Sequence, residues 1–277
     1  MNKKIGIVLA LVLVAFLVMG TASAGLFDFL GGDNASGNAT ANDEDTFIVG
    51  FDAEFPPYGY KDDSGNYTGF DLDLAKEVCD RNGWEFVAQP IDWDAKDAEI
   101  DSGSIDCIWN GFTIDGREND YTWSDPYFDN KQVFIVKSDA GINSIDDLSG
   151  KTVETQKDSS ALAALQGDNK TIADTFGTLT EVADYNTAFM DLESGACDAI
   201  AMDIGVGEYD IKNKDNPDDF KVLDQYITTE KYGIGFKKGN DALKDKVQDT
   251  LDEMFKDGTV SKIAEKYGIS EDALIQP

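Results

Sequence analysis

The 277-residue sequence contains no histidine, only two arginines and three cysteines. Without histidine, a serine or cysteine nucleophile would lack the imidazole base that usually activates it. The common zinc sites, which rely on histidine or on clustered cysteines, are equally poor candidates. We therefore expect neither a histidine-dependent hydrolase nor a metal site, and nothing in the sequence predicts a cofactor.

The three cysteines are Cys79, Cys107 and Cys197. Their spacing is too wide for a zinc knuckle, and each lies in an apolar or helical context. We interpret them as small buried hydrophobic residues. A disulfide between Cys79 and Cys107 stays open as an alternative for an exported protein, because disulfides form in oxidising compartments.

Positive charge is scarce as well, since 23 lysines and arginines face 54 aspartates and glutamates, for a formal net charge of −31. Such a field repels nucleic acids and anionic lipid surfaces, so we expect neither as a partner. We interpret the excess acid first as a source of solubility or an adaptation to salt. A role in attracting a ligand is the alternative.

The N-terminal 45 residues differ in composition from the rest. A run of 15 apolar or glycine residues, 5–19, follows "MNKK" and precedes the small residues "ASA" at 22–24. This pattern is typical of a secretory signal peptide covering residues 1–24, and the run is short for a membrane span. An uncleaved leader that anchors the protein is the alternative. Residues 25–45 are predicted to be a flexible linker. Glycosylation sequons occur at Asn34, Asn38, Asn66 and Asn169.

From residue 46 onward, short β-rich runs alternate with helical patterns, as expected of an α/β protein with mixed, mainly parallel sheets. Strands are predicted at 46–51, 84–89 and 105–111, and helices at 70–83 and 94–103. The segment "IDSGSIDCIWNG" (100–111) can be aligned with "LESGACDAIAMD" (192–203), which makes Gly111 and Asp203 equivalent. Both then follow the carboxyl end of a buried strand, where open α/β sheets bind ligands. Coincidence is the alternative, because a Ser-Gly helix end before a strand is common.

If each copy belongs to its own sheet, the chain forms two lobes. Strand 131–138 would leave the first lobe and 231–239 would return to it, leaving enough residues between them for one small domain. We predict a first lobe from 46–136, a second lobe from 137–229, and a return to the first lobe over 230–277, with a ligand cleft between the lobes that can close.

Several ordered motifs resemble one known family. They are "FPPYGY" (55–60), "GFDLDLAKEV" (69–78), "IWNGFTIDGR" (108–117), "YTWSDPYF" (121–128), "IDDLSGKTVETQKDSS" (145–160) and "AIAMD" (199–203). Together they resemble the family 3 solute-binding proteins, extracytoplasmic receptors that deliver polar amino acids to ABC transporters. The resemblance covers about 47–268 and implies the two-lobed, type II periplasmic-binding-protein fold.

The resemblance implies that Arg117 binds the ligand's α-carboxylate. A planar guanidinium forms two parallel charge-assisted hydrogen bonds that lysine cannot match. The alternative is a surface ion pair with Asp115, Glu118 or Asp120. The family pattern also implies that the Gly111 backbone meets the ligand's ammonium and that Thr113 meets its carboxylate. Here the sequence departs from the family, which commonly has one more residue between this threonine and the arginine.

On the other side of the cleft, the resemblance implies that Ser159 and Ser160 bind the carboxylate at a helix start. Asp158 occupies a position where the family often has glycine, and its charge is unfavourable there unless it points away or caps the helix. Asp203 is expected to hold the α-ammonium. Its alternative role is to cap the helix that begins near Gly205.

The family pattern assigns the ligand's side chain to Asp52, Phe55, Tyr58 and Trp93, although any of the three aromatic rings could instead be core packing. Phe55 and Trp93 would enclose it and Asp52 would meet its polar end, which favours a cationic amino acid, with glutamine or another polar one second.

The predicted function is therefore to bind a free amino acid outside the cytoplasmic membrane, in the periplasm or at the cell surface, and deliver it to an ABC transporter permease. We expect a monomer and no catalysis. One alternative is a secreted enzyme of the same fold, similar to cyclohexadienyl dehydratase, with Glu54 or Asp52 as general acid. The other is the ligand-binding component of a sensory system.

Overall fold

The computed structural model describes residues 46–276, and the structural statements below concern these residues. The predicted signal peptide (1–24), the linker (25–45) and the sequons at Asn34 and Asn38 lie outside them. Within the described part, no helix combines the length and the apolar character needed to cross a bilayer.

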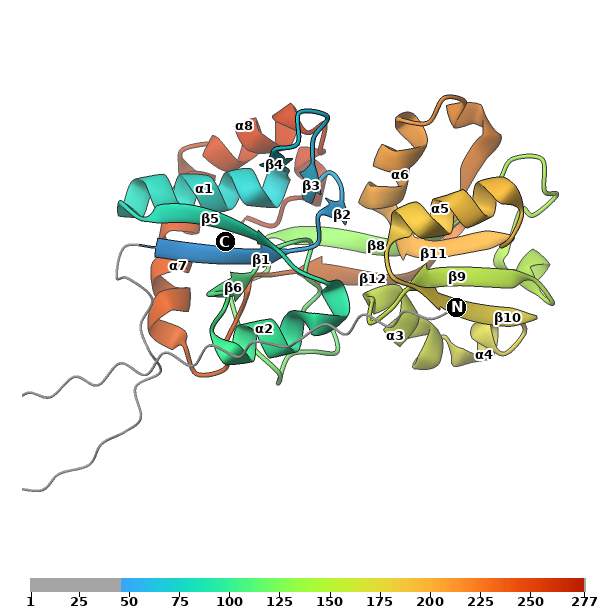
Figure 1. The fold of residues 1–277 in the computed structure, drawn as a ribbon, viewed down its shortest axis with the longest axis horizontal. Helices are drawn as coiled ribbons and strands as arrows, with labels where there is room; N and C mark the ends of the chain where they lie inside the picture. The colour runs from blue at the N-terminus through green and yellow to red at the C-terminus, as the bar shows by residue number, and fades with distance from the viewer. Residues whose placement is uncertain (1–45, 277) are drawn as a thin grey trace, which may run out of the picture. The chain divides into compact units, whose positions relative to one another are not determined.

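Two five-stranded sheets and a small three-stranded one organise the described residues (Figure 1). The first sheet has the order β5-β1-β6-β13-β7 and the second the order β10-β9-β11-β8-β12. The strands of the first sheet are β5 (Glu85–Pro90), β1 (Thr46–Phe51), β6 (Cys107–Ile108), β13 (Gly235–Phe236) and β7 (Thr122–Trp123). Those of the second are β10 (Thr178–Val182), β9 (Thr152–Gln156), β11 (Ala199–Asp203), β8 (Phe128–Lys137) and β12 (Phe220–Tyr232). The small sheet contains β2 (Glu54–Phe55), β3 (Gly59–Lys61) and β4 (Tyr67–Thr68).

Both larger sheets follow the same pattern of strand direction. The first three strands of each are parallel to one another, and the last two pair antiparallel. The expected mixed α/β architecture is confirmed, although the parallel pairings are fewer than predicted. The reason is that the chain enters the second sheet along β8 and returns to the first along β13. Each of these strands runs antiparallel to the first three strands of its sheet.

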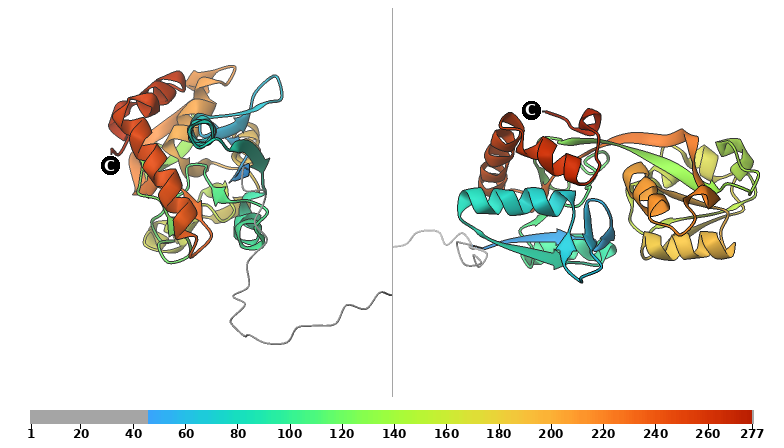
Figure 2. Two further views of the ribbon diagram at one scale, coloured as in Figure 1. Left: turned by 90° about the vertical axis from the view of Figure 1, so that its left-hand side faces the viewer. Right: turned by 90° about the horizontal axis from the view of Figure 1, so that it is seen from above.

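Helices cover both larger sheets (Figure 1). They are α1 (Phe70–Asn82), α2 (Lys96–Ser102), α7 (Asp241–Lys256) and α8 (Thr259–Lys266) around the first sheet, and α3 (Ser160–Gln166), α4 (Lys170–Ala173), α5 (Tyr185–Ser194) and α6 (Ile204–Lys212) around the second. Short 3-10 turns occupy Trp93–Ala95, Ile145–Leu148, Pro217–Asp219 and Glu271–Ala273. Figure 2 shows α1, α7 and α8 gathered together, in agreement with their mutual contacts. Helix α1 buries Leu72, Leu74, Ala75, Val78 and Cys79 and stops at Gly83 in the left-handed conformation.

The internal repeat has a structural counterpart. Helices α2 and α5 end at Gly103 and Gly195, whose φ values are 78° and 80°. Asp106 then accepts a hydrogen bond from the N–H of Ile48 on β1 (2.8 Å), and Asp198 accepts one from the N–H of Thr152 on β9 (2.9 Å). Each aspartate thereby fixes a new strand beside its parallel neighbour, which places Gly111 and Asp203 at the same edge of their sheets.

Strands β8 and β12 form the long pair that joins the two sheets (Figure 2). They pair from Phe128 and Tyr232 to Lys137 and Phe220, with irregular register between Val222 and Thr228. Residues 131–136, which we assigned to the first lobe, hydrogen-bond to β11 and β12 and so belong to the second sheet. The expected return strand 231–239 is divided between β12 and β13, because each half pairs with a different sheet.

The three cysteines are buried and free, with no disulfide between Cys79 and Cys107. Burial is the main cause that raises the pKa of the Cys79 and Cys197 thiols to about 12. All three therefore pack as small apolar residues.

Candidate ligand-binding site

A small pocket lies at the carboxyl ends of strands from both sheets, with about 290 Å³ of space when the solvent at its mouth is included. Asp52 follows β1, Gln156 ends β9 and Asp203 ends β11. The lining comprises Asp52, Phe55, Trp93, Asn110, Gly111, Thr113, Arg117, Gln156, Ser159, Ser160 and Asp203. Nine of the ten residues predicted from the sequence are in this set, and Tyr58 is not.

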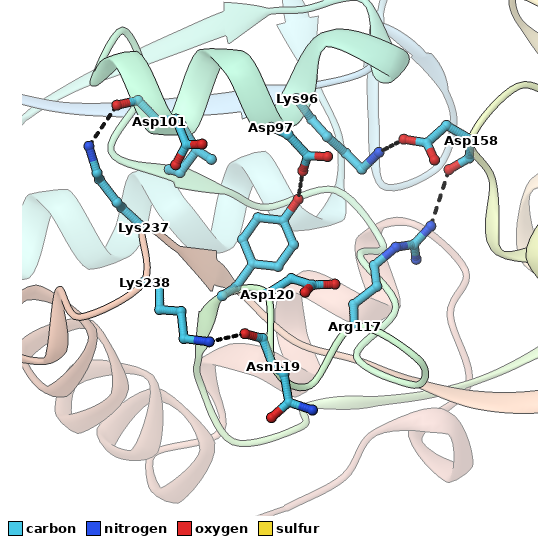
Figure 3. A pocket seen from close by; sticks show the side chains of 11 residues that line it. Lys96, Asp97, Asp101, Arg117, Asn119, Asp120, Asp158, Lys237 and Lys238 are labelled. Atoms are coloured by element: carbon cyan, nitrogen blue, oxygen red, sulfur yellow. Dashed lines mark hydrogen bonds and ion pairs between the residues drawn. The ribbon is translucent and has the colours of Figure 1, made fainter.

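Hydrogen bonds hold the backbone of Arg117, and separate contacts position its guanidinium. Its N–H donates to the Ile114 carbonyl (2.8 Å), and its carbonyl accepts from the Trp123 indole (3.0 Å). The guanidinium carbon lies 5.4 Å from the centre of the Phe112 ring. One guanidinium nitrogen donates to the backbone carbonyl of Asp158 at 3.1 Å (Figure 3).

Arg117 has no acidic partner among the described residues, since no carboxylate oxygen lies within 4.0 Å of its nitrogens. The alternative pairing with its acidic loop neighbours is thus not formed, and Asp115 instead accepts from the N–H of Lys231 (2.7 Å). Arg81, the other arginine, is held by two carboxylates at 2.8 Å each. The positive charge of Arg117 is therefore available to an anionic group in the pocket.

Glycine is required at position 111. Its φ is 55°, and a Cβ there would lie 2.9 Å from the Phe55 ring and 3.1 Å from the Tyr232 ring. The Gly111 N–H donates to Asp71 at 2.5 Å. Thr113 is 3% exposed and forms an isolated bridge with Tyr232, so the loop between β6 and Arg117 is firmly seated.

Asp52 also lines the pocket and is bound from both sheets. Its carboxylate accepts from the N–H of Glu54 (2.8 Å) and from the side-chain amide of Gln156 (2.6 Å). Its own N–H donates to the side-chain oxygen of Asn110 (2.7 Å). Burial is the main cause that raises its pKa above the usual aspartate value. A ligand group that reaches Asp52 would therefore compete with Gln156.

The aromatic residues divide into two groups. Phe55 and Trp93 line the pocket, and Trp93 stands edge-on to Phe112 with ring centres 5.4 Å apart. Tyr58 is 1% exposed and packs edge-on against Phe128 and Tyr232. Its contact with a ligand stays a prediction. In this structure the turn in which its N–H bonds to the Phe55 carbonyl (3.1 Å) is followed by a ring directed into the core.

The two serines are already engaged in different ways. Ser159 is the N-cap of α3 and accepts from the N–H of Leu162 at 3.1 Å. The Ser160 hydroxyl donates to the carboxylate of Glu230, a buried residue on β12. The Ser160 hydroxyl proton is committed to Glu230, and the Ser159 N–H donates to the Gln156 carbonyl (3.2 Å). The Ser160 N–H and the Ser159 hydroxyl, which also lies 3.2 Å from the Thr155 hydroxyl, are therefore the candidate donors to a ligand carboxylate.

Asp158 adopts a φ of 56°, a left-handed conformation that explains why glycine is favoured at this place. Its carboxylate pairs with Lys96, which is only 2% exposed, and Asp158 is not among the residues that line the candidate pocket. Figure 3 shows this pair in the neighbouring pocket, which Arg117 also lines. An aspartate at this place was expected to be tolerable if it pointed away from the ligand or capped the helix. The pairing of Asp158 with Lys96 corresponds to the first of these two arrangements.

Residues near the pocket connect the two sheets through four side-chain pairs. They are Asp52–Gln156, Glu54–Asn186, Asp94–Lys157 and Lys96–Asp158. The first residue of each pair comes from the segments between β1 and β6. The second lies on β9 or between β9 and β11 of the second sheet. Figure 3 shows that Lys96 and Arg117 converge on Asp158 from the same side.

Asp203 is 4% exposed and lies at the junction of β11 and α6. Its Oδ1 accepts from Asn130 (2.7 Å), Gln132 (2.8 Å) and the Tyr232 hydroxyl (2.5 Å). Burial, followed by the charge of Glu230, raises its pKa to about 8. Its side chain makes no capping bond to α6, so the alternative role as a helix cap is wrong.

Five residues of this site were not predicted from the sequence. They are Asn110 and Gln156 in the lining, and Asn130, Gln132 and Glu230 around Asp203. Asn110 directly precedes Gly111, and Gln156 lies three residues before Ser159 in the same quoted motif, and this closeness in sequence was the available signal. The described residues contain no group of three or more Cys, Asp or Glu placed to hold a metal ion.

Two mixed sheets with a pocket at facing strand ends define a ligand-binding protein of the type II periplasmic-binding-protein fold. The chain belongs to the bacterial extracellular solute-binding proteins, family 3, whose pattern matches residues 47–270.

Three relatives place the chain within this fold. It is 32% identical over 229 residues to the L-cystine-binding protein TcyJ of Escherichia coli K12, covering 80% of this chain and 82% of TcyJ. A substrate-binding protein of Streptococcus pneumoniae solved with bound histidine shares 31% identity at a TM-score of 0.77, covering 80% of this chain and 92% of the other. An ancestral arginine-binding protein solved with arginine shares 37% identity at a TM-score of 0.73, with coverages of 80% and 97%.

Proposed function

We propose that this protein binds a free amino acid outside the cytoplasmic membrane and delivers it to the permease of an ABC transporter. One observation carries the proposal. Arg117, which has no acidic partner in the described part of the chain, and the buried Asp203 line the same small pocket from opposite sheets. Such a pair of opposite charges suits the α-carboxylate and α-ammonium of an amino acid. The relatives named above, which bind cystine, histidine and arginine, support the same role.

The side-chain end of the pocket favours a cationic amino acid first and a polar one second. Asp52 and Trp93 line it, and Glu54 stands beside them on β2. A carboxylate and an aromatic face together suit a guanidinium or ammonium group. Micromolar affinity corresponds to about −8 kcal/mol, which is within reach of an amino acid of about ten heavy atoms.

We further propose that the two sheets belong to two lobes whose approach closes the pocket, with β8 and β12 as the connection. The four side-chain pairs between the sheets would then form on closure, and a ligand held by Arg117 and Asp203 would stabilise that state. We infer secretion through residues 1–24, either cleaved or retained as an anchor, and a monomeric receptor without catalytic activity. Size-exclusion chromatography and recovery of unchanged amino acid after long incubation test the last two points.

The decisive experiment is a thermal-shift screen of the protein against the twenty amino acids. A ligand present at 100 times its dissociation constant adds about 2.7 kcal/mol of stability, which gives a readily measured rise in melting temperature. We expect one chemical class to stabilise the protein, and Arg117→Ala and Asp203→Ala to abolish the response.

Arg81→Ala is the matched control, because Arg81 lies outside the pocket and is already paired with Glu77 and Asp257. It should keep the ligand response of the unaltered protein. If no amino acid raises the melting temperature, or if Arg117→Ala responds as strongly as Arg81→Ala, the proposal is wrong.

A further inference from the structure

A second buried carboxylate lies behind Asp203. Glu230 on β12 is 4% exposed, as is Asp203. The side-chain amide of Asn130 donates to both of them, at 2.7 Å to Asp203 Oδ1 and 2.8 Å to Glu230 Oε1. The amide of Gln132 does the same, at 2.8 and 2.7 Å. One oxygen of each acid is therefore held beside the other by the same two donors.

No cation balances these two acids in the described part of the chain, since no lysine or arginine nitrogen lies within 4.0 Å of either. Two carboxylates that share a dry site cannot both ionise cheaply, and such pairs retain a proton. The amide donors do not change this conclusion, because they are neutral.

The other groups that face the pair do not supply positive charge either. They are the hydroxyls of Ser160 on α3, Tyr58 after β2, Tyr185 on α5 and Tyr232 on β12. Burial and the nearby acids raise the pKa of the three tyrosines, so all three remain neutral. Asp71, which acts on Tyr58, is a further buried acid whose pKa is raised to about 7 chiefly by burial, and it supplies no positive charge.

We propose that Glu230 is a positioning residue of the ammonium site: together with Asp203 it forms a carboxyl pair that shares one proton while the site is empty and releases that proton when a ligand's α-ammonium arrives. The inference rests on the proposed function, in which Asp203 receives that ammonium. Ligand binding exchanges a proton for a fixed positive charge, and the proton leaves to solvent. Binding is then weaker at low pH, where the proton competes with the ligand, and stronger at high pH.

The sign follows from the empty site. The pKa of Asp203 is raised to about 8 by burial and by Glu230, so the acid is neutral below that pH. Ammonium binding requires the ionised form, and each pH unit below about 8 therefore weakens binding about tenfold. The chain has no histidine whose titration could produce the same slope between pH 6 and 8.

The test is titration calorimetry with L-arginine from pH 6 to 9, repeated at pH 7 in buffers of different ionisation enthalpy. L-Arginine keeps its own charges over most of this range. We expect the unaltered protein to release close to one proton at pH 6 to 7. In Glu230→Gln, Asp203 ionises more easily, so fewer protons are released on binding. The pH above which the dissociation constant no longer changes is then lower than in the unaltered protein.

Asp210→Asn is the matched control. Burial raises the pKa of Asp210 to about 7 as well, but this residue lies on α6 outside the pocket lining. Its replacement should leave the proton release unchanged. A merely structural role for Glu230 predicts a ratio of dissociation constants, variant to unaltered protein, that is the same at every pH. That result, or the absence of proton release in the unaltered protein, overturns the inference.

A measurement without ligand separates this inference from the proposed function. Infrared spectra of the empty protein at pH 7 should contain a protonated-carboxyl band that decreases in both Asp203→Asn and Glu230→Gln. If L-arginine gives no binding heat but the band behaves in this way, the preference for a cationic ligand fails and the shared proton stands. If the band is unchanged in both variants, the shared proton is refuted whatever binds.

Discussion

Asp158 is where the sequence departs from the family and where the departure has a physical explanation. A left-handed backbone favours glycine, and aspartate is among the few other residues that adopt it readily. Its carboxylate pairs with the buried Lys96, whose Nζ also lies 5.2 Å from the centre of the Trp93 ring. Asp158 therefore connects the two sheets through its ion pair with Lys96, while its own backbone adopts the left-handed conformation.

We expect Asp158→Asn to lower the free energy of unfolding by about 1–2 kcal/mol, since it leaves the buried Lys96 ammonium without a counter-charge while keeping the backbone conformation accessible. Urea unfolding measures the change. Asp94→Asn is the control, because the pair Asp94–Lys157 is exposed and should contribute nothing measurable. Equal effects of the two substitutions would show that burial of Lys96 is not what matters.

At the level of single residues, the sequence predicted most of the pocket because its motifs carry residues with special chemistry. Arg117 stood out as one of two arginines, and Asp203 through the internal repeat. Glu230 and Gln132 were not predicted because they are 98 residues apart in the sequence. Only the pairing of β8 with β12 brings them together. Tyr58 was assigned to the ligand because a motif gives the position of a ring and not its direction.

At the level of elements, two helices that start with aspartate illustrate different uses of the same residue. Asp184 precedes α5 and accepts from the N–H of Thr187 at 2.7 Å. Asp203 precedes α6 and makes no such bond, and its Oδ1 accepts from side chains on β8 and β12 instead. The aspartate thus caps the helix at the start of α5, whereas at the start of α6 it lines the pocket and leaves the helix without a side-chain cap.

Asp184→Ala should therefore cost about 1 kcal/mol of folding free energy, through loss of the cap, and leave amino-acid affinity within about twofold. Thermal unfolding and calorimetry on the same variant measure both quantities. Asp184→Asn retains an acceptor at the cap and is expected to restore the stability. A large loss of affinity in Asp184→Ala would mean that the start of α5 takes part in binding.

Element positions were predictable where a strong local signal marked them, as with the glycines that end α1, α2 and α5. The strand predicted at 105–111 is paired only over Cys107–Ile108, because the following residues turn toward the pocket. Strand β12 was recognised only at its end. Its sequence "FKVLDQYITTEKY" mixes charged and apolar residues irregularly, and the register of its pairing with β8 shifts twice.

For the whole molecule, several buried acids keep protons at neutral pH. The pKa of Asp203 is raised to about 8 and those of Asp71 and Asp210 to about 7, in each case chiefly by burial. In the unfolded chain these carboxyls have pKa values near 4. Between pH 4 and 8 the folded protein therefore binds more protons than the unfolded one, and its stability falls as pH rises.

We expect the free energy of unfolding to decrease by more than about 1.4 kcal/mol from pH 5 to pH 8, the equivalent of one pKa unit at one group. Urea unfolding at constant ionic strength measures it. Repeating the series in high salt screens the repulsion that accompanies a net charge of −31 and isolates the contribution of the buried acids. Stability that is flat or rises with pH would show that these groups are ionised in the folded state.

The long strand pair β8 and β12 carries Asn130, Gln132, Glu230 and Tyr232, the residues that hold Asp203. Asp52, Phe55 and Trp93 lie outside this strand pair, on the loop after β1, on β2 of the small sheet and in the 3-10 turn Trp93–Ala95. Under the proposed function, the group that all amino acids share is held by the connection between the sheets, and the group that distinguishes them is met by residues outside it. Substitutions at the second set would then change the ligand while leaving the first intact.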